Sequence, residues 1–155
     1  MNEYRLSTDT KEITLKQLQH LIATVPDMLF EISETELARK PAPDKWSKKE
    51  IIGHLIDSAT NNHHRFVRAQ FEENPTILYH QNLWTEYGFY QQMDGRQLIA
   101  FWSLYNQHLI ELIRKIPQEE LETRGCTMSD EKTYSLSWLF DDYVRHMEHH
   151  LKQIM

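Results

Sequence analysis

Four segments of this sequence repeat apolar residues at every third or fourth position, and this spacing restricts the chain to a helical fold. In the first segment the pattern predicts a helix from about residue 18 to residue 32. Its apolar positions are Leu18, Ile22, Val25, Leu29 and Ile32. Pro26 lies inside the pattern and predicts a kink or a break, because proline lacks a backbone donor.

The other three helices have recognisable start and stop signals. Ser47 and Glu50 have the spacing of a capping box, so a second helix should run from Ser47 to about residue 70. The apolar spacing predicts a third helix after Asp94, up to residue 116, and a fourth from about residue 135 to residue 154. Each of these helices has one apolar face that another helix must cover.

The segments between the helices are less regular. Residues 75–95 lack a sustained period but hold five aromatic side chains, which either cap the core or line a ligand pocket. Residues 118–134 are predicted to form a polar connection with a turn at Gly125. Because four amphipathic helices with no strand between them must bury their faces on one another, we expect a single all-α domain over residues 1–155, folded as a four-helix bundle.

Charge and composition exclude several classes of protein. The net charge of -6 and the scattered lysines and arginines give no basic face for nucleic acid. No apolar run reaches the roughly 18 residues that cross a membrane, so we expect a cytoplasmic protein. Cys126 is the only cysteine, which excludes an internal disulfide and a cluster of thiolate ligands. Any soft metal ligands would therefore have to come from the nine histidines.

Histidines on the last helix suggest a metal site. His146 and His150 are four residues apart at the border of the apolar face, and two such rings can share one ion, whereas His149 should face solvent. Three histidines commonly hold a catalytic metal and leave a fourth position free. The third ligand would come from the second helix, where the spacing leaves both His54 and His63 open and places His63 closer to the apolar face.

Three motifs make the chain similar to a known family. They are Lys45-Trp46-Ser47, Gly53-His54-Leu55-Ile56-Asp57-Ser58, and the segment Asp142-Tyr143-Val144-Arg145-His146-Met147-Glu148-His149-His150-Leu151-Lys152-Gln153-Ile154. From about residue 37 to residue 154 the chain resembles the DinB-like superfamily of damage-inducible and thiol-transferase proteins. The resemblance implies an up-down-down-up bundle, a homodimer, and one divalent ion, zinc or nickel, on His54, His146 and His150.

The resemblance also implies two kinds of chemistry. Members of the family transfer low-molecular-weight thiols, perform a thiol-dependent isomerisation, or are named metal-dependent hydrolases. We therefore expect an enzyme that transfers a small-molecule thiol to an electrophilic substrate or hydrolyses a small molecule. The nucleophile would be metal-bound water, whose pKa falls to about 7, or a metal-bound thiol. The alternative is a non-enzymatic stress-response or ligand-binding bundle.

Three further residues are candidates for substrate binding. Asn61 lies two turns beyond His54 on the same side of the second helix, so it could orient a substrate or simply be solvated. Trp84 and Tyr87 in the aromatic segment are predicted to form a pocket wall. Nothing near Cys126 in the sequence activates its thiol, so we expect no catalytic role for it.

Overall fold

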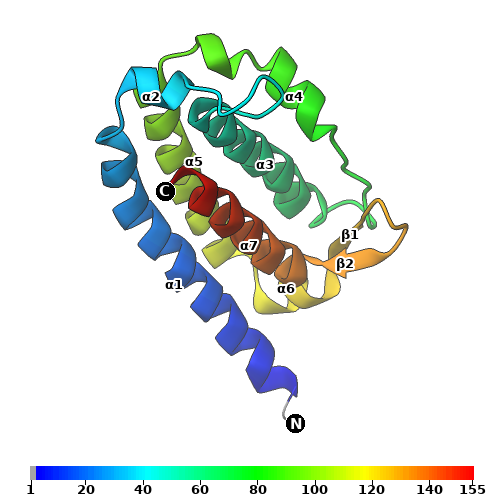
Figure 1. The fold of residues 1–155 in the computed structure, drawn as a ribbon. Coiled ribbons are helices and arrows are strands. Elements are labelled where there is room, and N and C mark those ends of the chain that lie inside the picture. The colour runs from blue at the N-terminus through cyan, green and yellow to red at the C-terminus, as the bar shows by residue number, and fades with distance from the viewer. Residues whose placement is uncertain (1–2) are drawn as a thin grey trace.

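Four long helices form the body of the molecule (Figure 1). The structure is a computed structural model that describes the backbone of residues 3–155 and the side chains of residues 10–155. The four helices are α1 (Glu3–Phe30), α3 (Lys48–Arg68), α5 (Gly95–Lys115) and α7 (Leu136–Ile154). Helices α1 and α7 run in one direction and α3 and α5 in the other, which is the expected up-down-down-up arrangement. Both α1 and α3 pack against α5 and α7, so the bundle is closed on all four sides.

The parallel direction of α3 and α5 explains the long segment between them. A chain that leaves the end of α3 must return along the whole bundle before it can start α5 in the same direction. Residues 69–94 make this return and contain α4 (Gln81–Tyr87) and the short 3-10 helix η1 (Tyr90–Gln92). With α2 (Glu34–Ala38), which links α1 to α3, they cover the outer side of α3 (Figure 1).

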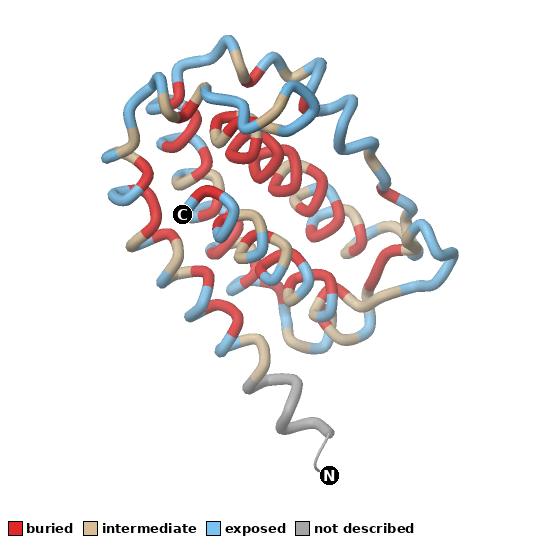
Figure 2. The backbone as a smooth tube through the Cα atoms, viewed as in Figure 1, coloured by how far each residue is buried: buried red, intermediate tan, exposed pale blue. Residues whose placement is uncertain are grey.

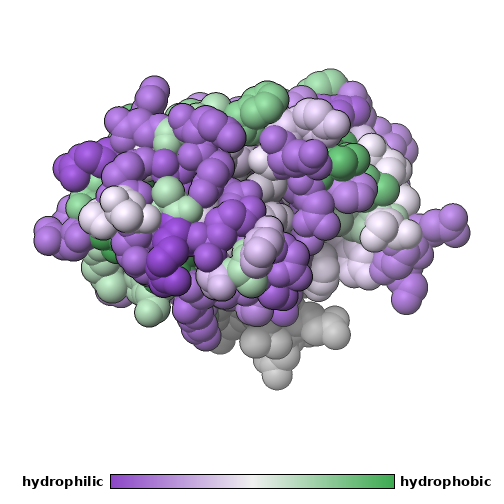
Figure 3. All heavy atoms as spheres, turned by 45° about the horizontal axis from the view of Figure 1, so that its top comes forward, coloured by the Kyte–Doolittle hydropathy of each residue, from purple (hydrophilic) through white to green (hydrophobic). Residues whose placement is uncertain are grey.

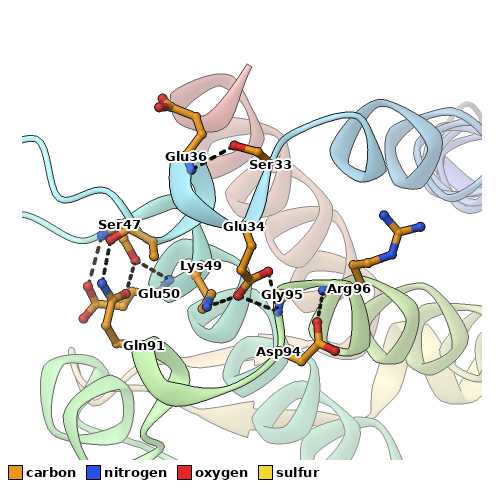
Figure 4. Close-up of polar contacts among 11 residues, drawn as sticks. Ser33, Glu34, Glu36, Ser47, Lys49, Glu50, Gln91, Asp94, Gly95 and Arg96 are labelled. Carbon is orange, nitrogen blue, oxygen red and sulfur yellow. Dashed lines mark hydrogen bonds and ion pairs between the residues drawn. The ribbon is translucent and has the colours of Figure 1, made fainter.

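Local capping contacts confirm where the sequence starts its helices. The Ser47 hydroxyl accepts a hydrogen bond from the Glu50 backbone N–H at 3.1 Å, and the Glu50 carboxylate accepts one from the Ser47 N–H at 3.1 Å (Figure 4). Asp94 accepts from the backbone N–H of Arg96 at the start of α5. Ser135 caps α7 in the same way. These contacts involve neighbours in sequence, which is why the sequence alone predicted the caps at Ser47 and Asp94. At Ser135 it predicted the start of the helix but not the cap.

Two local predictions were wrong. Of the two alternatives at Pro26, the break does not occur: helix α1 begins at Glu3, before the predicted start near residue 18, and continues through Pro26 to Phe30. Burial of Val25 and Leu29 on either side offsets the missing backbone bond. Residues 118–134 are not a simple polar connection with a turn at Gly125. They form α6 (Gln118–Thr123) and most of an antiparallel hairpin of β1 (Gly125–Thr127) and β2 (Thr133–Ser135).

Gly125 has a different role from the predicted one. It pairs with Ser135 inside the hairpin, and a Cβ atom at this position would lie 2.0 Å from the backbone oxygen of Tyr134. Only glycine permits this close approach of the two strands. The turn lies further along, where Glu131 adopts a φ of 64°.

The core lies between the four long helices, as the buried residues in Figure 2 show. Its largest fully buried side chains are Trp102, Phe66 and Phe140. Helix α3 is unusual because every residue from Ile51 to Ala59 is buried, so it has no solvent face over this stretch. The face of the molecule in Figure 3 is mostly hydrophilic with separate apolar patches. Among the described residues, no helix is both long enough and apolar enough to cross a membrane.

Candidate metal centre

The antiparallel packing of α3 and α7 places three histidines at the same level of the bundle. His54 lies six residues after the first residue of α3 (54 − 48), and His146 and His150 lie eight and four residues before the last residue of α7 (154 − 146 and 154 − 150). At 1.5 Å per residue, all three are therefore about 6–12 Å from the same end of the helix pair. The two helices are in direct contact, so the three rings can meet.

The ring nitrogens of these histidines converge on one point. Nε2 of His146 lies 3.1 Å from Nε2 of His54 and 3.1 Å from Nε2 of His150. The possible ligand atoms of the three residues all lie within 4.8 Å of one another. Two nitrogens that each bind one ion at about 2.0–2.1 Å in near-tetrahedral geometry are roughly 3.1–3.4 Å apart. The spacing therefore suits a shared divalent ion.

Hydrogen bonding alone does not account for this geometry. A neutral imidazole nitrogen carries either one hydrogen or one lone pair. Nε2 of His146 faces two other nitrogens, so it cannot form an ordinary hydrogen bond with both. A cation that accepts all three lone pairs satisfies the three nitrogens at once, and the donor set therefore fits a metal ion.

Burial keeps these imidazoles neutral. Burial, together with a smaller contribution from the neighbouring histidines, lowers the pKa of His54 to about 3 and the pKa of His146 to about 4. The pKa of His150 is also lowered by burial, while its hydrogen bond to Gln153 acts in the opposite direction. At neutral pH the rings therefore keep lone pairs, the form that binds a metal.

Contacts around the triad orient two of its rings. Nδ1 of His150 donates a hydrogen bond to the Gln153 side-chain oxygen at 3.0 Å, which directs the Nε2 lone pair toward the other histidines. The Trp46 ring lies 4.9 Å from the His54 ring and 6.4 Å from the His150 ring, measured between centroids. Nδ1 of His54 is buried and has no hydrogen-bond partner in the described part of the chain.

The structure brings His54, and not His63, to the pair on α7. Nδ1 of His63 lies 2.9 Å from the Tyr105 hydroxyl, and its ring centroid is 5.4 Å from that of His108 on α5. His149 is exposed, as expected. The spacing argument had placed His63 closer to the apolar face of this helix. It could not choose between the two because α3 is buried on every side near His54.

A cavity of about 590 Å³ opens beside the triad. His150 and Gln153 border it from α7, Trp46 borders it from the segment before α3, and Gln81 and Asn82 border it from α4. No sequence pattern marked the last three residues as part of a site. Trp46 was visible only as part of the motif that opens α3, and no local signal connects α4 with a histidine about 70 residues away.

The three predicted substrate-binding residues lie elsewhere. Trp84 and Tyr87 border a second cavity, of about 480 Å³. Asn61 is buried, its amide donates to the backbone oxygen of Asp57 at 2.9 Å, and it lines neither cavity. Their role in binding substrate stays a prediction. Cys126 is buried in β1, and burial raises the pKa of its thiol, so the ordinary thiol form is favoured there.

Comparison with known proteins shows the same fold over most of this chain and about four fifths of the relatives. A Bacillus subtilis protein named "Putative metal-dependent hydrolase YfiT" is 23% identical over 151 residues, which cover 96% of this chain and 84% of that protein. A Bacillus pumilus protein named "Putative metal-dependent hydrolase" is 25% identical over 147 residues, or 92% and 82% of the two chains. The solved structure of YfiT, described as a four-helix bundle of unusual topology, superposes with a TM-score of 0.81 at 22% identity. It covers 91% of this chain and 81% of that one.

The family relationship extends over nearly the whole bundle. Residues 14–154 match the family described as the DinB superfamily. This region includes most of α1, all of the other helices and the three converging histidines. The motifs, the helix order and the matched region agree, and the chain therefore belongs to the DinB superfamily.

Proposed function

We propose that this protein is a metal-dependent hydrolase of a small molecule, with one divalent ion bound by His54, His146 and His150. The observation that carries this proposal is the convergence of three neutral Nε2 atoms beside a cavity that reaches His150. The names of the related Bacillus proteins support hydrolysis as the reaction. Zinc and nickel are the proposed ions, because both accept imidazole ligands.

The metal and the surrounding side chains would have different roles in the reaction. A divalent ion on three imidazoles keeps a position free and lowers the pKa of a bound water to about 7. Trp46 covers the His54 ring and limits the access of bulk water from that side. The amides of Gln81 and Asn82 border the cavity and offer donors and acceptors that orient a polar substrate. Asp44 and Lys45, also at this cavity, add one charge of each sign that can pair with polar groups of a substrate.

The size and openness of the cavity favour an enzyme over a closed binding module. A volume of about 590 Å³ lies within the range of small-molecule sites. Because His150 borders this space, a substrate could approach the metal position without unfolding of the bundle. The buried Cys126 is not suited to act as a nucleophile, which leaves the chemistry to the metal centre.

The first test is metal content. We expect close to one divalent ion per chain in the untagged full-length protein, and less than a tenth of that in His146→Ala and in His150→Ala. His149→Ala is the matched control, since it removes an exposed histidine from the same helix and should leave the metal content unchanged. Elemental analysis measures the metal content of the wild type and of the three folded variants. Full metal content in both ligand variants would contradict the proposed centre.

The second test is the reaction. The metal-loaded protein should hydrolyse members of a panel of small esters, amides and lactones, lose this activity on chelation and regain it with zinc or nickel. The same preparations are offered low-molecular-weight thiols with an electrophile. Conjugation without hydrolysis would replace our proposal with thiol transfer, and metal binding without either reaction would favour the ligand-binding module. A cytoplasmic location and a homodimer stay predictions, and sedimentation analysis tests the dimer.

A further inference from the structure

A second cavity lies against the outer side of α3 and is separate from the one beside His150. Its volume is about 480 Å³, and it is bordered by α3, α4 and the segment that leads into η1. The residues at its border are Asp57, Leu83, Trp84, Tyr87, Gly88 and Tyr90. None of them borders the other cavity and none is a proposed metal ligand. The second cavity therefore needs its own explanation.

Asp57 is the polar group of this cavity and is only partly satisfied. The side chain is 3% exposed, and its Oδ1 accepts a hydrogen bond from the Tyr90 hydroxyl. Its Oδ2 is buried and has no hydrogen-bond partner among residues 10–155. Burial raises the pKa of Asp57 to about 6, so the carboxyl group is still ionised at neutral pH. A buried anionic oxygen without a donor is costly in a folded protein, and a bound donor would remove that cost.

The walls of the cavity favour a cation over an anion. Among residues 10–155, Asp57 is the only charged residue at its border, and no lysine, arginine or histidine lines it. Trp84 and Tyr87 are 39% and 68% exposed, so their rings are open to a ligand. The faces of tryptophan and tyrosine attract cations, and their apolar area can cover the body of a ligand.

The backbone around the cavity holds Tyr90 firmly against α3. A Cβ atom at Gly53 would lie 2.1 Å from Cδ2 of the Tyr90 ring, and one at Gly88 would lie 2.8 Å from its Cε2. Both positions therefore require glycine. Phe89, directly before Tyr90, has a left-handed backbone with a φ of 57°, which a bulky residue rarely adopts. In this position the Tyr90 hydroxyl donates to Oδ1 of Asp57, and Oδ2 is without a partner among the described residues.

We propose that this cavity binds a small primary amine with an aromatic or apolar body. The ammonium group donates to Oδ2 of Asp57, and the body of the ligand packs against Trp84 and Tyr87. This site goes beyond the proposed hydrolase activity because it uses no metal ligand. It also gives Trp84 and Tyr87 a specific ligand class.

The test is a titration of the full-length protein with three probes of similar shape and different charge. Phenethylammonium is the cation, 2-phenylethanol is the neutral analogue and phenylacetate is the anion. Calorimetry gives the affinities, and NMR follows the indole resonance of Trp84, assigned with Trp84→Phe. We expect phenethylammonium to shift this resonance and to bind at least tenfold more tightly than either analogue. No shift at tens of millimolar, or equal affinity for the cation and the alcohol, would overturn the proposal.

Variants identify the group that binds the cation. Asp57→Asn keeps the shape of the side chain and the acceptor for Tyr90, and it should weaken phenethylammonium at least tenfold. Glu86→Gln is the matched control, since it removes an exposed carboxylate from α4 that does not border the cavity. Should Asp57→Asn fail to fold, Trp84→Ala at a half-exposed position tests the same site and should weaken binding at least threefold. Unchanged affinity in the folded variant overturns the proposal.

A final control separates this site from the metal centre, because an amine can also bind a metal ion. The titration is repeated with His146→Ala. Unchanged affinity for phenethylammonium supports the separate site, whereas loss of binding assigns the amine to the metal centre and overturns the proposal. The result does not depend on whether the protein is a hydrolase, because binding to Asp57 is measurable in a protein without metal.

Discussion

Helix α3 carries two histidine clusters that differ in burial and in the ring atoms that meet. His54 is fully buried, and its Nε2 meets the Nε2 atoms of two histidines on α7. His63 is half-buried, and its Nδ1 meets the hydroxyl of Tyr105, with the His108 ring alongside. Both clusters bring rings within about the same distance, 4.6–4.9 Å from His54 and 5.4–5.5 Å from His63 between centroids.

The difference shows that ring proximity alone does not make a metal site. In the His63 cluster a hydroxyl satisfies the ring nitrogen, and partial exposure lets water satisfy the rest. In the His54 cluster three nitrogens face one another in a buried place, where hydrogen bonds cannot satisfy all of them. A metal site is therefore better recognised by ring nitrogens that converge where few other hydrogen-bond partners are available. Four experiments test this criterion, and a fifth tests the carboxylate that lies between the two clusters on α3.

The largest effect is expected on metal loading when the His54 cluster loses its ring on α3. His54→Ala should reduce the metal content to less than a tenth of an ion per chain, because two histidines on one helix hold zinc poorly. His63→Ala should keep the full content. Elemental analysis of both folded variants checks this. An equal loss of metal in the two variants would remove the distinction between the clusters.

Metal binding should also stabilise the fold through the first cluster only. An ion present at about a thousand times its Kd raises the free energy of unfolding by about 4 kcal/mol. At roughly 2–4 °C per kcal/mol for a chain of this size, chelation should lower Tm by about 8–16 °C. Calorimetry should show this shift in the wild type and in His63→Ala and no shift in His54→Ala. A wild-type Tm that does not respond to chelation would count against the centre.

Asp57, which lies on α3 between the two clusters, should affect stability in a pH-dependent way. Its pKa is raised from 3.8 to about 6, so between these values the folded state holds a proton that the unfolded state has lost. The free energy of unfolding therefore falls as pH rises from about 4 to 6, and above pH 6 the penalty is complete, on the order of 3 kcal/mol. Asp57→Asn should remove it.

Urea unfolding at two pH values measures this effect. Asp57→Asn should stabilise the protein by up to about 3 kcal/mol at pH 7 and by almost nothing at pH 4. Glu86→Gln, at an exposed position on α4, should change the stability by less than about 0.5 kcal/mol at either pH. A gain that is equal at pH 4 and pH 7 would show that the charge of Asp57 is not its cause.

A smaller effect is expected when the hydrogen bond behind His150 is removed. Gln153 accepts from Nδ1 of His150, and loss of such an outer contact commonly weakens metal affinity by about 10–100-fold. Gln153→Ala should therefore bind zinc more weakly by this factor and still reach one ion per chain at saturation. Competition with a chromophoric chelator measures the affinity. A zinc affinity equal to that of the wild type would mean that the His150 ring binds the metal without the hydrogen bond to Gln153.

The smallest effect is expected in the second cluster. Tyr105→Phe removes the hydroxyl that pairs with His63, but water can reach this half-buried ring. The free energy of unfolding should fall by less than about 1 kcal/mol, and zinc affinity should not change. Urea unfolding and the same chelator competition check both values. A clear loss of zinc affinity would show that the His63 cluster influences metal binding, which contradicts the distinction between the two clusters.

Much of the fold was predictable because its signals are local. The caps at Ser47, Asp94 and Ser135 join residues within one turn, and the apolar spacing marks the buried face of each long helix. Residues 118–134 were harder, since pairing of β1 with β2 depends on a close approach at Gly125 that composition does not reveal. The pair His146 and His150 was predictable for the same reason as the caps, because residues four apart on a helix are neighbours.

The amino-acid pattern alone was enough for the helical bundle, for the starts of α3, α5 and α7, and for the neighbouring histidine pair on α7. Only the tertiary structure decided which histidine of α3 joins that pair. A helical wheel assumes one buried and one exposed face, but the returning segment 69–94 covers α3 from outside and leaves Ile51–Ala59 without a solvent side. The two cavities were decided in the same way. Their walls come from segments far apart in the chain. These segments meet because α3 and α5 are parallel, so the chain between them must return along the bundle.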